Sequence, residues 1–288
     1  MDVILEKLSD WIRSLLISGI MRNLSGIFDS VNTQAANIAT EVGTTPADFS
    51  PEVFSMIRQV SETVILPVAG VIMTFIACVE LIQMVIDHNN LASFETWFFF
   101  RWVIKTFIAV LVISNTFPIV MAVFEAAQQV VNGAAGIIGG DAVISEDTLA
   151  DIRTTLDTME VGELFGLFLQ SMIIQLVMQA IAIVIFIIVY GRMIEIYLTT
   201  SLAPIPLATF GNREQSQMGQ NYLRSLAALG LQGFLILICV GIYSVLISQA
   251  AISDDLIASL WGVVGYSVLL CFTLFKTGAL ARAVLNTR

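Results

Sequence analysis

Five long apolar segments constrain this chain more than any other feature, because each is long enough to cross a lipid bilayer as an α-helix. A helix needs about 20 predominantly apolar residues to span the hydrocarbon core. Backbone groups in lipid must also be paired within the protein, which leaves only helices and closed barrels. The sequence therefore predicts an all-α, polytopic integral membrane protein. We expect its spans at 63–86, 102–124, 165–190, 226–248 and 257–275.

The composition agrees with lipid as the main solvent. Apolar residues make up 57% of the 288-residue chain and charged residues 12%, and the mean hydropathy is +0.87. Soluble domains have about 45–50% apolar and about 25% charged residues. The formal net charge of −10, with no cluster of lysine and arginine, argues against phosphate binding as the main function.

Few residues in the chain suit catalysis. Cys78, Cys239 and Cys271 lie inside apolar segments and form no CxxC pair, so we expect small buried thiols rather than a disulfide framework or a zinc site. His88 is the only histidine, and one histidine builds neither a triad nor a metal site. Phosphate loops and the GxSxG and HExxH motifs do not occur. We expect no enzymatic activity, with no catalytic, cofactor-binding or metal-binding residues.

The first part of the chain is less apolar than the rest. Apolar residues recur at helical spacing over 1–28, which predicts an amphipathic helix that lies on a membrane or packs on a partner helix. A polar stretch follows over 29–50, where Thr45 precedes a proline as an N-cap. We expect 1–62 to be an extracytoplasmic amphipathic N-terminal region and 63–288 to be the transmembrane bundle.

Two segments interrupt the predicted bundle. The hydrophilic insert 125–163 combines a glycine-rich turn, Gly133–Asp141, with an amphipathic helix whose N-cap is Ser145. Pro204 and Pro206 lack backbone N–H groups in the apolar stretch SLAPIPLATF. Irregular backbone at membrane depth persists only inside protein or beside water. We therefore expect a proline-broken, re-entrant hairpin there.

The first two predicted spans carry one charge each, Glu80 and Lys105. They lie at similar distances from the loop that joins the spans, so an antiparallel hairpin places them at similar depth. A charge within a membrane usually faces protein or water. The two residues form either the polar lining of a conduit or a structural ion pair near the cytoplasmic interface. Pro67 is expected to bend the first span near its start.

Lysine and arginine near helix ends mark the cytoplasmic side of a membrane protein. The tail 276–288 carries Lys276, Arg282 and Arg288, which places the C-terminus inside. The insert 125–163 has Arg153 among eight acidic residues, which places it outside. With five spans, the N-terminus is then expected to be extracytoplasmic.

The order of these parts resembles a known family. An outside amphipathic N-terminus, five spans, an acidic insert and a broken hairpin are similar to the TrbL-like polytopic subunit of conjugative type IV secretion systems. The most specific stretch is GRMIEIYLTTSLAPIPLATF at 191–210, followed by GNREQSQ, and it resembles the versions in mobile elements of Gram-positive bacteria. The resemblance implies a cell-membrane channel or scaffold subunit of the DNA/protein translocation apparatus, without catalytic residues.

The same resemblance implies a set of partners. These are membrane lipid, further copies of the chain in a homo-oligomeric ring, a conjugation ATPase, a bitopic membrane subunit and, transiently, relaxase-bound single-stranded DNA. Two other functions fit part of the pattern. A scaffold without a conduit differs only in whether its oligomer encloses water. A secondary transporter with a broken-helix substrate site would share the proline break, but the sequence predicts one break, without a matching one in a second repeat.

Overall fold

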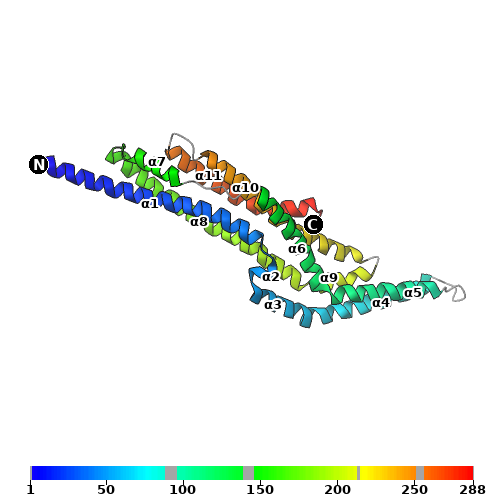
Figure 1. The fold of residues 1–288 in the computed structure, drawn as a ribbon. Helices are drawn as coiled ribbons and strands as arrows, with labels where there is room; N and C mark the ends of the chain where they lie inside the picture. The colour runs from blue at the N-terminus through cyan, green and yellow to red at the C-terminus, as the bar shows by residue number, and fades with distance from the viewer. Residues whose placement is uncertain (1, 88–95, 139–145, 213–214, 251–255, 288) are drawn as a thin grey trace. The chain divides into compact units, whose positions relative to one another are not determined.

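The computed structural model describes residues 2–87, 96–138, 146–212, 215–250 and 256–287 (Figure 1). The structure is 94% helical and has no strand among these residues, which confirms the all-α prediction. In chain order the elements are α1 (Asp2–Val42), α2 (Pro46–Phe49), α3 (Pro51–Val60), the π-helix η1 (Ser61–Ile65), α4 (Leu66–Asp87), α5 (Thr96–Ser114), α6 (Thr116–Ile138), α7 (Glu146–Leu156), α8 (Val161–Ser201), α9 (Pro204–Ala208), the 3-10 helix η3 (Thr209–Gly211), α10 (Ser216–Ala250) and α11 (Leu256–Val284).

Five helical segments of the described chain are long and apolar enough to cross a membrane. Their number confirms the prediction, and each overlaps one of the predicted spans. Their bounds are Pro51–Ile86, Trp97–Ser114, Val161–Gly211, Ser216–Gln249 and Ile257–Val284.

The second predicted span was wrong at its C-terminal end. Helix α5 stops at Ser114 and α6 begins at Thr116, where 102–124 was expected to run through. Pro118 explains the break, because it has no N–H for the carbonyl of Ser114 and its ring clashes with that carbonyl. At the break, Asn115 donates both its backbone N–H, at 3.1 Å, and its side-chain Nδ2, at 2.8 Å, to the carbonyl of Leu111.

The predicted glycine-rich turn in the insert was also wrong over the residues that can be compared. Gly133 and Gly136 lie inside α6, and a Cβ at either position would meet no atom within 4 Å. Residues 139–141 and Ser145 lie outside the described residues, as does His88. Helix α7 follows at Glu146, and Leu156 at its end is fully buried.

Helix α1 is longer than predicted and packs on its own chain. The polar stretch 29–50 was expected to end the helix at residue 28, whereas α1 continues to Val42. Its apolar face continues at helical spacing as well, and this explains the extra length. The buried side chains of α1 are Leu16, Ile17, Ile20, Leu24, Ile27, Phe28, Val31, Ala35, Ile38 and Val42.

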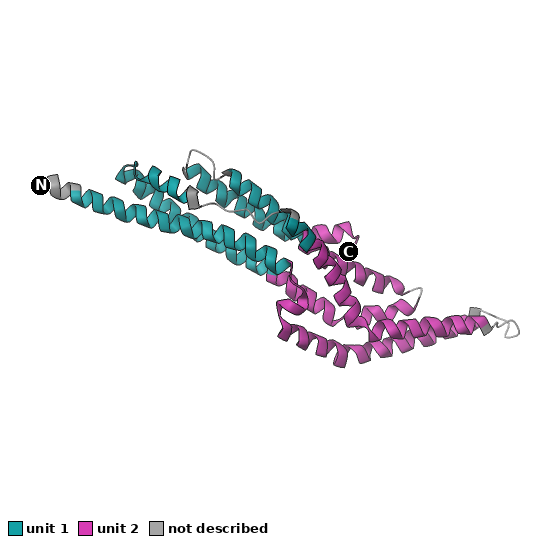
Figure 2. Cartoon of the chain, viewed as in Figure 1, with its two compact units in different colours: residues 1–42, 132–189, 235–277 teal, residues 43–131, 190–234, 278–288 magenta. Residues whose placement is uncertain are grey.

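The chain divides into two compact units (Figure 2). Unit 1 comprises residues 1–42, 132–189 and 235–277, and unit 2 comprises 43–131, 190–234 and 278–288. In unit 1, α1 runs parallel to α8. Asn23 Nδ2 donates to Ser171 Oγ at 3.0 Å, and Gly19 lies so close to Phe168 that an added Cβ would be 2.7 Å from the ring. Small and polar residues commonly let membrane helices approach in this way.

Candidate functional site

Three of the apolar helical segments in unit 2 are interrupted, and each of these interruptions precedes a proline. The π-helix η1 ends just before Pro67, the α5–α6 break precedes Pro118, and α8 ends at Ser201 just before Pro204. A proline removes one main-chain hydrogen bond and pushes against the carbonyl four residues earlier. A wider π-turn or a break relieves that clash. The bend expected at Pro67 thus takes the form of a π-helix.

These three interruptions meet in one place, which we name the proline corner (residues 61–73, 109–120 and 202–211). Helix α9 packs against α4, α5 and η1. Ala69, Ile113 and Ala208 form its buried centre, one residue from each interrupted segment. The corner therefore joins the α4–α5 hairpin to the end of α8.

Around Pro204 and Pro206, backbone carbonyls accept from N–H groups three residues later in the chain, instead of the four residues of an α-helix. The N–H of Ala203 donates to the carbonyl of Thr200 at 3.2 Å, and that of Ile205 donates to Leu202 at 3.2 Å. In an unbroken α-helix these two carbonyls would accept from residues 204 and 206, but Pro204 and Pro206 have no backbone N–H. The break can thus lie in an apolar environment without exposing these carbonyls.

The segment after the prolines is fastened to the start of α10. Thr209 Oγ1 donates to the carbonyl of Pro206 at 2.7 Å and accepts from the N–H of Gly219 at 3.1 Å. A Cβ at Gly219 would lie 2.8 Å from the Pro206 oxygen, so only glycine fits without a shift. Tyr222 on α10 also donates its hydroxyl to the carbonyl of Thr199 at 3.0 Å.

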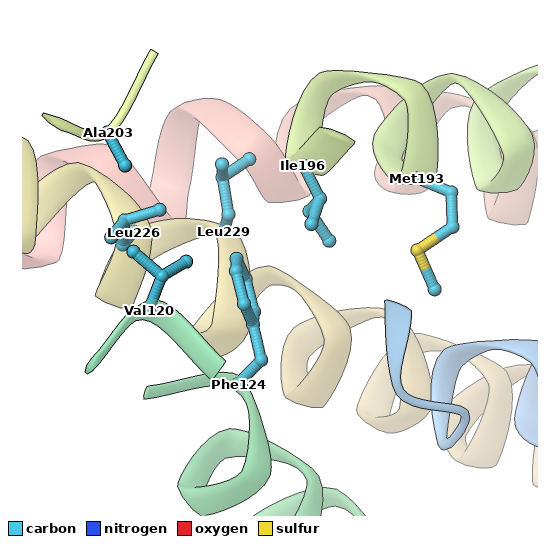
Figure 3. Packing of buried hydrophobic residues seen from close by; sticks show 7 residues of the cluster. All are labelled: Val120, Phe124, Met193, Ile196, Ala203, Leu226 and Leu229. Carbon is cyan, nitrogen blue, oxygen red and sulfur yellow. The ribbon is translucent and has the colours of Figure 1, made fainter. Parts of the chain in front are cut away.

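A second buried cluster of unit 2 lies beside the corner and joins three helices (Figure 3). Val120 and Phe124 come from α6, and Leu226 and Leu229 come from α10. Met193 and Ile196 from α8 complete it, together with Ala203 just before the prolines. This cluster fixes the direction in which α8 enters the break.

Arg192 is a buried charge that the sequence analysis did not single out as a site residue. Its side chain is buried, with 7% of its surface exposed, and its Nε donates to the carbonyl of Leu229 at 3.3 Å. The structure records no ion pair for it among the described residues. A charge so deep in an apolar helix is costly and usually faces protein or water. The sequence did hold a signal for this burial, because Arg192 stands four residues before Ile196 and so lies on the apolar face of α8.

Glu80 and Lys105 form an ion pair between α4 and α5, which run antiparallel. Both side chains are about one-quarter to one-third exposed, and Trp102 beside them donates Nε1 to the carbonyl of Ala77 at 3.2 Å. Within the described chain, no hydrogen bond or ion pair links these two residues to Pro204 or Pro206. The two sets of predicted residues are therefore separate features of unit 2.

The described residues contain no group of three or more His, Cys, Asp or Glu that could hold a metal ion. The three cysteines are free thiols. Cys239 and Cys271 are half-buried, but Cys78 is exposed, so the expectation of a buried thiol was wrong there. The reason is that the chain itself leaves that face of α4 uncovered.

Together these features define an all-helical, multi-pass membrane protein whose helices are broken at a buried proline corner. A family model described as TrbL/VirB6 plasmid conjugal transfer like protein matches residues 31–204, more than half of the chain. The protein belongs to this family, and the resemblance seen in the sequence is confirmed. The family is named for conjugal transfer and not for a catalysed reaction. No match was found among curated proteins or among solved structures.

Proposed function

We propose that this protein is a channel or scaffold subunit of a conjugative type IV secretion system, and that several copies form part of its DNA/protein translocation apparatus. The observation that carries the proposal is the family match over 31–204, because the family is described by its link to plasmid conjugal transfer. The match also includes most of the proline corner. The proposed partners are a conjugation ATPase, a bitopic membrane subunit and, transiently, a relaxase-bound single strand of DNA.

The uncovered surface of the spans supports a role in an assembly. Only 11% of the residues in the apolar windows of Pro51–Ile86 and Trp97–Ser114 are buried inside the chain. The rest of these faces must contact lipid or other proteins. The net charge of −10 also suits a conduit for DNA, because an acidic wall would not hold phosphates tightly.

Self-association is proposed to use the first turns of α1. Most of the apolar face of α1 is buried within unit 1, which leaves the part before Leu16. There Leu8, Trp11, Ile12 and Leu15 are exposed at helical spacing, between 36% and 61% of their surfaces. Lys7, Asp10 and Ser14 beside them are exposed and mixed in charge. A helix that bound only anionic lipid would be richer in lysine and arginine.

The proposed orientation has the N-terminus outside and the C-terminus in the cytoplasm. The Arg13 guanidinium donates to the carbonyl of Asp157, so the first turns of α1 contact the end of α7, which is also proposed to lie outside. The outside position is proposed for these first turns only, because Pro46, after α1, accepts a hydrogen bond from Tyr197, which lies beyond the third predicted span.

In a background without native cysteines, we expect a membrane-impermeant maleimide to label Thr158→Cys and not Gln217→Cys. Both positions are exposed in the structure. Equal labelling of the two in intact cells would contradict this orientation.

Deletion of the coding sequence from its mobile element tests the role in transfer. We expect conjugal transfer to be lost and to return when the wild-type gene is supplied in trans, whereas growth and element copy number stay unchanged. Transfer at the normal frequency after deletion would contradict the proposal. That result would favour the transporter alternative, for which the three proline breaks of unit 2 are the relevant structural feature.

A further inference from the structure

A groove of about 330 Å³ runs along one face of α5 in unit 2. Arg101 and Lys105 line one end, Ile104, Ile108 and Val112 line the rest, and Phe210 closes one side. The residues of α5 recur every three or four positions, so they share one face of the helix. The groove is thus cationic at one end and apolar along its length.

The length of the groove matches one leaflet of a bilayer. Arg101 and Val112 are eleven residues apart, which is about 16 Å along an α-helix. Half of the hydrocarbon core of a bilayer is about 15 Å. Trp97 also lines the groove, one turn before Arg101, and 63% of its surface is exposed. Tryptophan is enriched at the level of lipid headgroups, so Trp97 and Arg101 mark the headgroup end.

The charges at that end favour an anion. Lys105 is paired with Glu80, so these two charges cancel, and an ammonium group still has two N–H donors when one is used. Arg101 has no ion pair among the described residues, and its side chain is exposed. Its guanidinium is a second cation at that end, and its planar donors match the geometry of a phosphate.

We propose that this groove binds one anionic phospholipid. Its phosphodiester contacts Arg101, with Lys105 as a second donor, and one acyl chain lies along Ile104, Ile108 and Val112. A zwitterionic lipid binds less well because its own amine compensates the phosphate charge. The binding site does not depend on what the assembly transports, so the proposal goes beyond the function in conjugal transfer.

Quenching of tryptophan fluorescence by lipids with brominated acyl chains tests the site. The chain has four tryptophans, and the variant with Trp11, Trp102 and Trp261 changed to Phe reports on Trp97 alone. This full-length variant is reconstituted in phosphatidylcholine and titrated with brominated phosphatidylglycerol or brominated phosphatidylcholine. We expect half-maximal quenching at an about five-fold lower mole fraction of the anionic lipid, the effect of roughly one interfacial arginine.

Charge variants separate this groove from a general attraction of the protein for anionic lipid. Arg101→Gln is expected to remove the preference and Arg101→Lys to retain most of it. Arg224→Gln, which removes an exposed cation on α10, is expected to leave it unchanged. Equal quenching by both lipids, or an unchanged preference in Arg101→Gln, would overturn the proposal. So would a loss of the preference on adding inorganic phosphate but not chloride at equal ionic strength, because the groove would then take a free anion.

Discussion

All six prolines of the chain lie in unit 2, and unit 1 has none. The helices differ accordingly. In unit 1, α1 runs for 41 residues without interruption beside the first part of α8. In unit 2, η1, the α5–α6 break and α9 interrupt what the apolar pattern alone would make continuous. Hydrophobicity thus decides which segments enter the membrane, whereas the missing N–H groups decide where they break.

The two units also differ in how their helices are held together. Both units bury apolar side chains. Unit 1 adds close approach and hydrogen bonds between side chains, such as Asn23 with Ser171 and Tyr243 with Ser267 at 2.8 Å. Unit 2 adds hydrogen bonds from side chains to the backbone, such as the bond from Tyr197 to the carbonyl of Pro46 at 2.7 Å. Such bonds suit a broken helix, since they satisfy carbonyls near the interruption.

The largest effect is expected when both prolines of the hairpin are replaced. Each proline disfavours a continuous helix by about 3 kcal/mol or more, so Pro204→Ala/Pro206→Ala should let α8 extend past Ser201 and withdraw α9 from α4 and α5. Spin labels at Ile194→Cys and Met218→Cys, both exposed, measure the result. We expect one narrow distance distribution in the wild type, and a longer or broader one in the variant, with reduced transfer.

Pro51→Ala is the control for that variant, because Pro51 occupies the first turn of α3, where a missing N–H breaks no helical bond. It should leave both the distance distribution and transfer unchanged. The account of the proline corner would be wrong if the double variant kept the wild-type distance and transferred normally.

Glycine substitutions should separate a crowded position from an open one. Gly219→Ala puts a Cβ against the Pro206 oxygen and should destabilise unit 2 by about 1–3 kcal/mol through overpacking. Gly191→Ala, in the middle of α8 with no atom within 4 Å, should stabilise by about 0.5–1 kcal/mol. Thermal unfolding in one detergent compares the two. If the two changes had effects of the same sign, the packing assigned to Gly219 would be wrong.

A smaller loss is expected when the charge pair of the hairpin is broken. Lys105→Met leaves Glu80 without its cation and should destabilise by about 1–2 kcal/mol, less than a lone charge at the centre of a bilayer would cost. Glu80→Gln combined with Lys105→Met should recover most of the loss, because no unpaired charge remains. A double-mutant cycle that gave no coupling would show that the pair does not contribute to stability.

The smallest effect concerns the hydrogen bond between α1 and α8. A coupling energy of about 0.6 kcal/mol is typical of side-chain hydrogen bonds between membrane helices. The cycle of Asn23→Ala, Ser171→Ala and the double variant should return that value, with the double loss smaller than the sum of the single losses. Strict additivity would mean that the two side chains do not interact.

Much of the fold could be predicted from periodicity and caps. The number of spans is correct, and each overlaps its predicted position. Thr45 accepts from the N–H of Asp48 at 3.1 Å as the N-cap of α2. The end of α1 was wrong because Asn32 and Gln34 look like a loop, although Val31, Ile38 and Val42 continue the apolar face. This error came from giving the polar residues of 29–50 more weight than the helical spacing of the apolar residues among them.

The proline corner could be predicted only in part. Pro204 and Pro206 stand out in an apolar stretch, but the sequence reasoning did not use Pro118, whose effect on a helix is the same. That the three interruptions meet depends on the packing of α9 against α4 and α5, which are distant in sequence. A proline in the sequence predicts that a helix breaks there, but it does not predict which distant helices pack against the break. The environment of Arg192 was missed for the same reason, because its acceptor lies 37 residues away.

The central claim is that several copies of this protein form one assembly in the membrane through the first turns of α1. Native mass spectrometry of the full-length protein in mild detergent measures this most directly. We expect one oligomeric mass for the wild type, smaller species for Trp11→Glu/Leu15→Glu, and an unchanged oligomer for Met56→Glu, which alters an exposed apolar residue of α3. Monomers alone in the wild-type sample would contradict the claim.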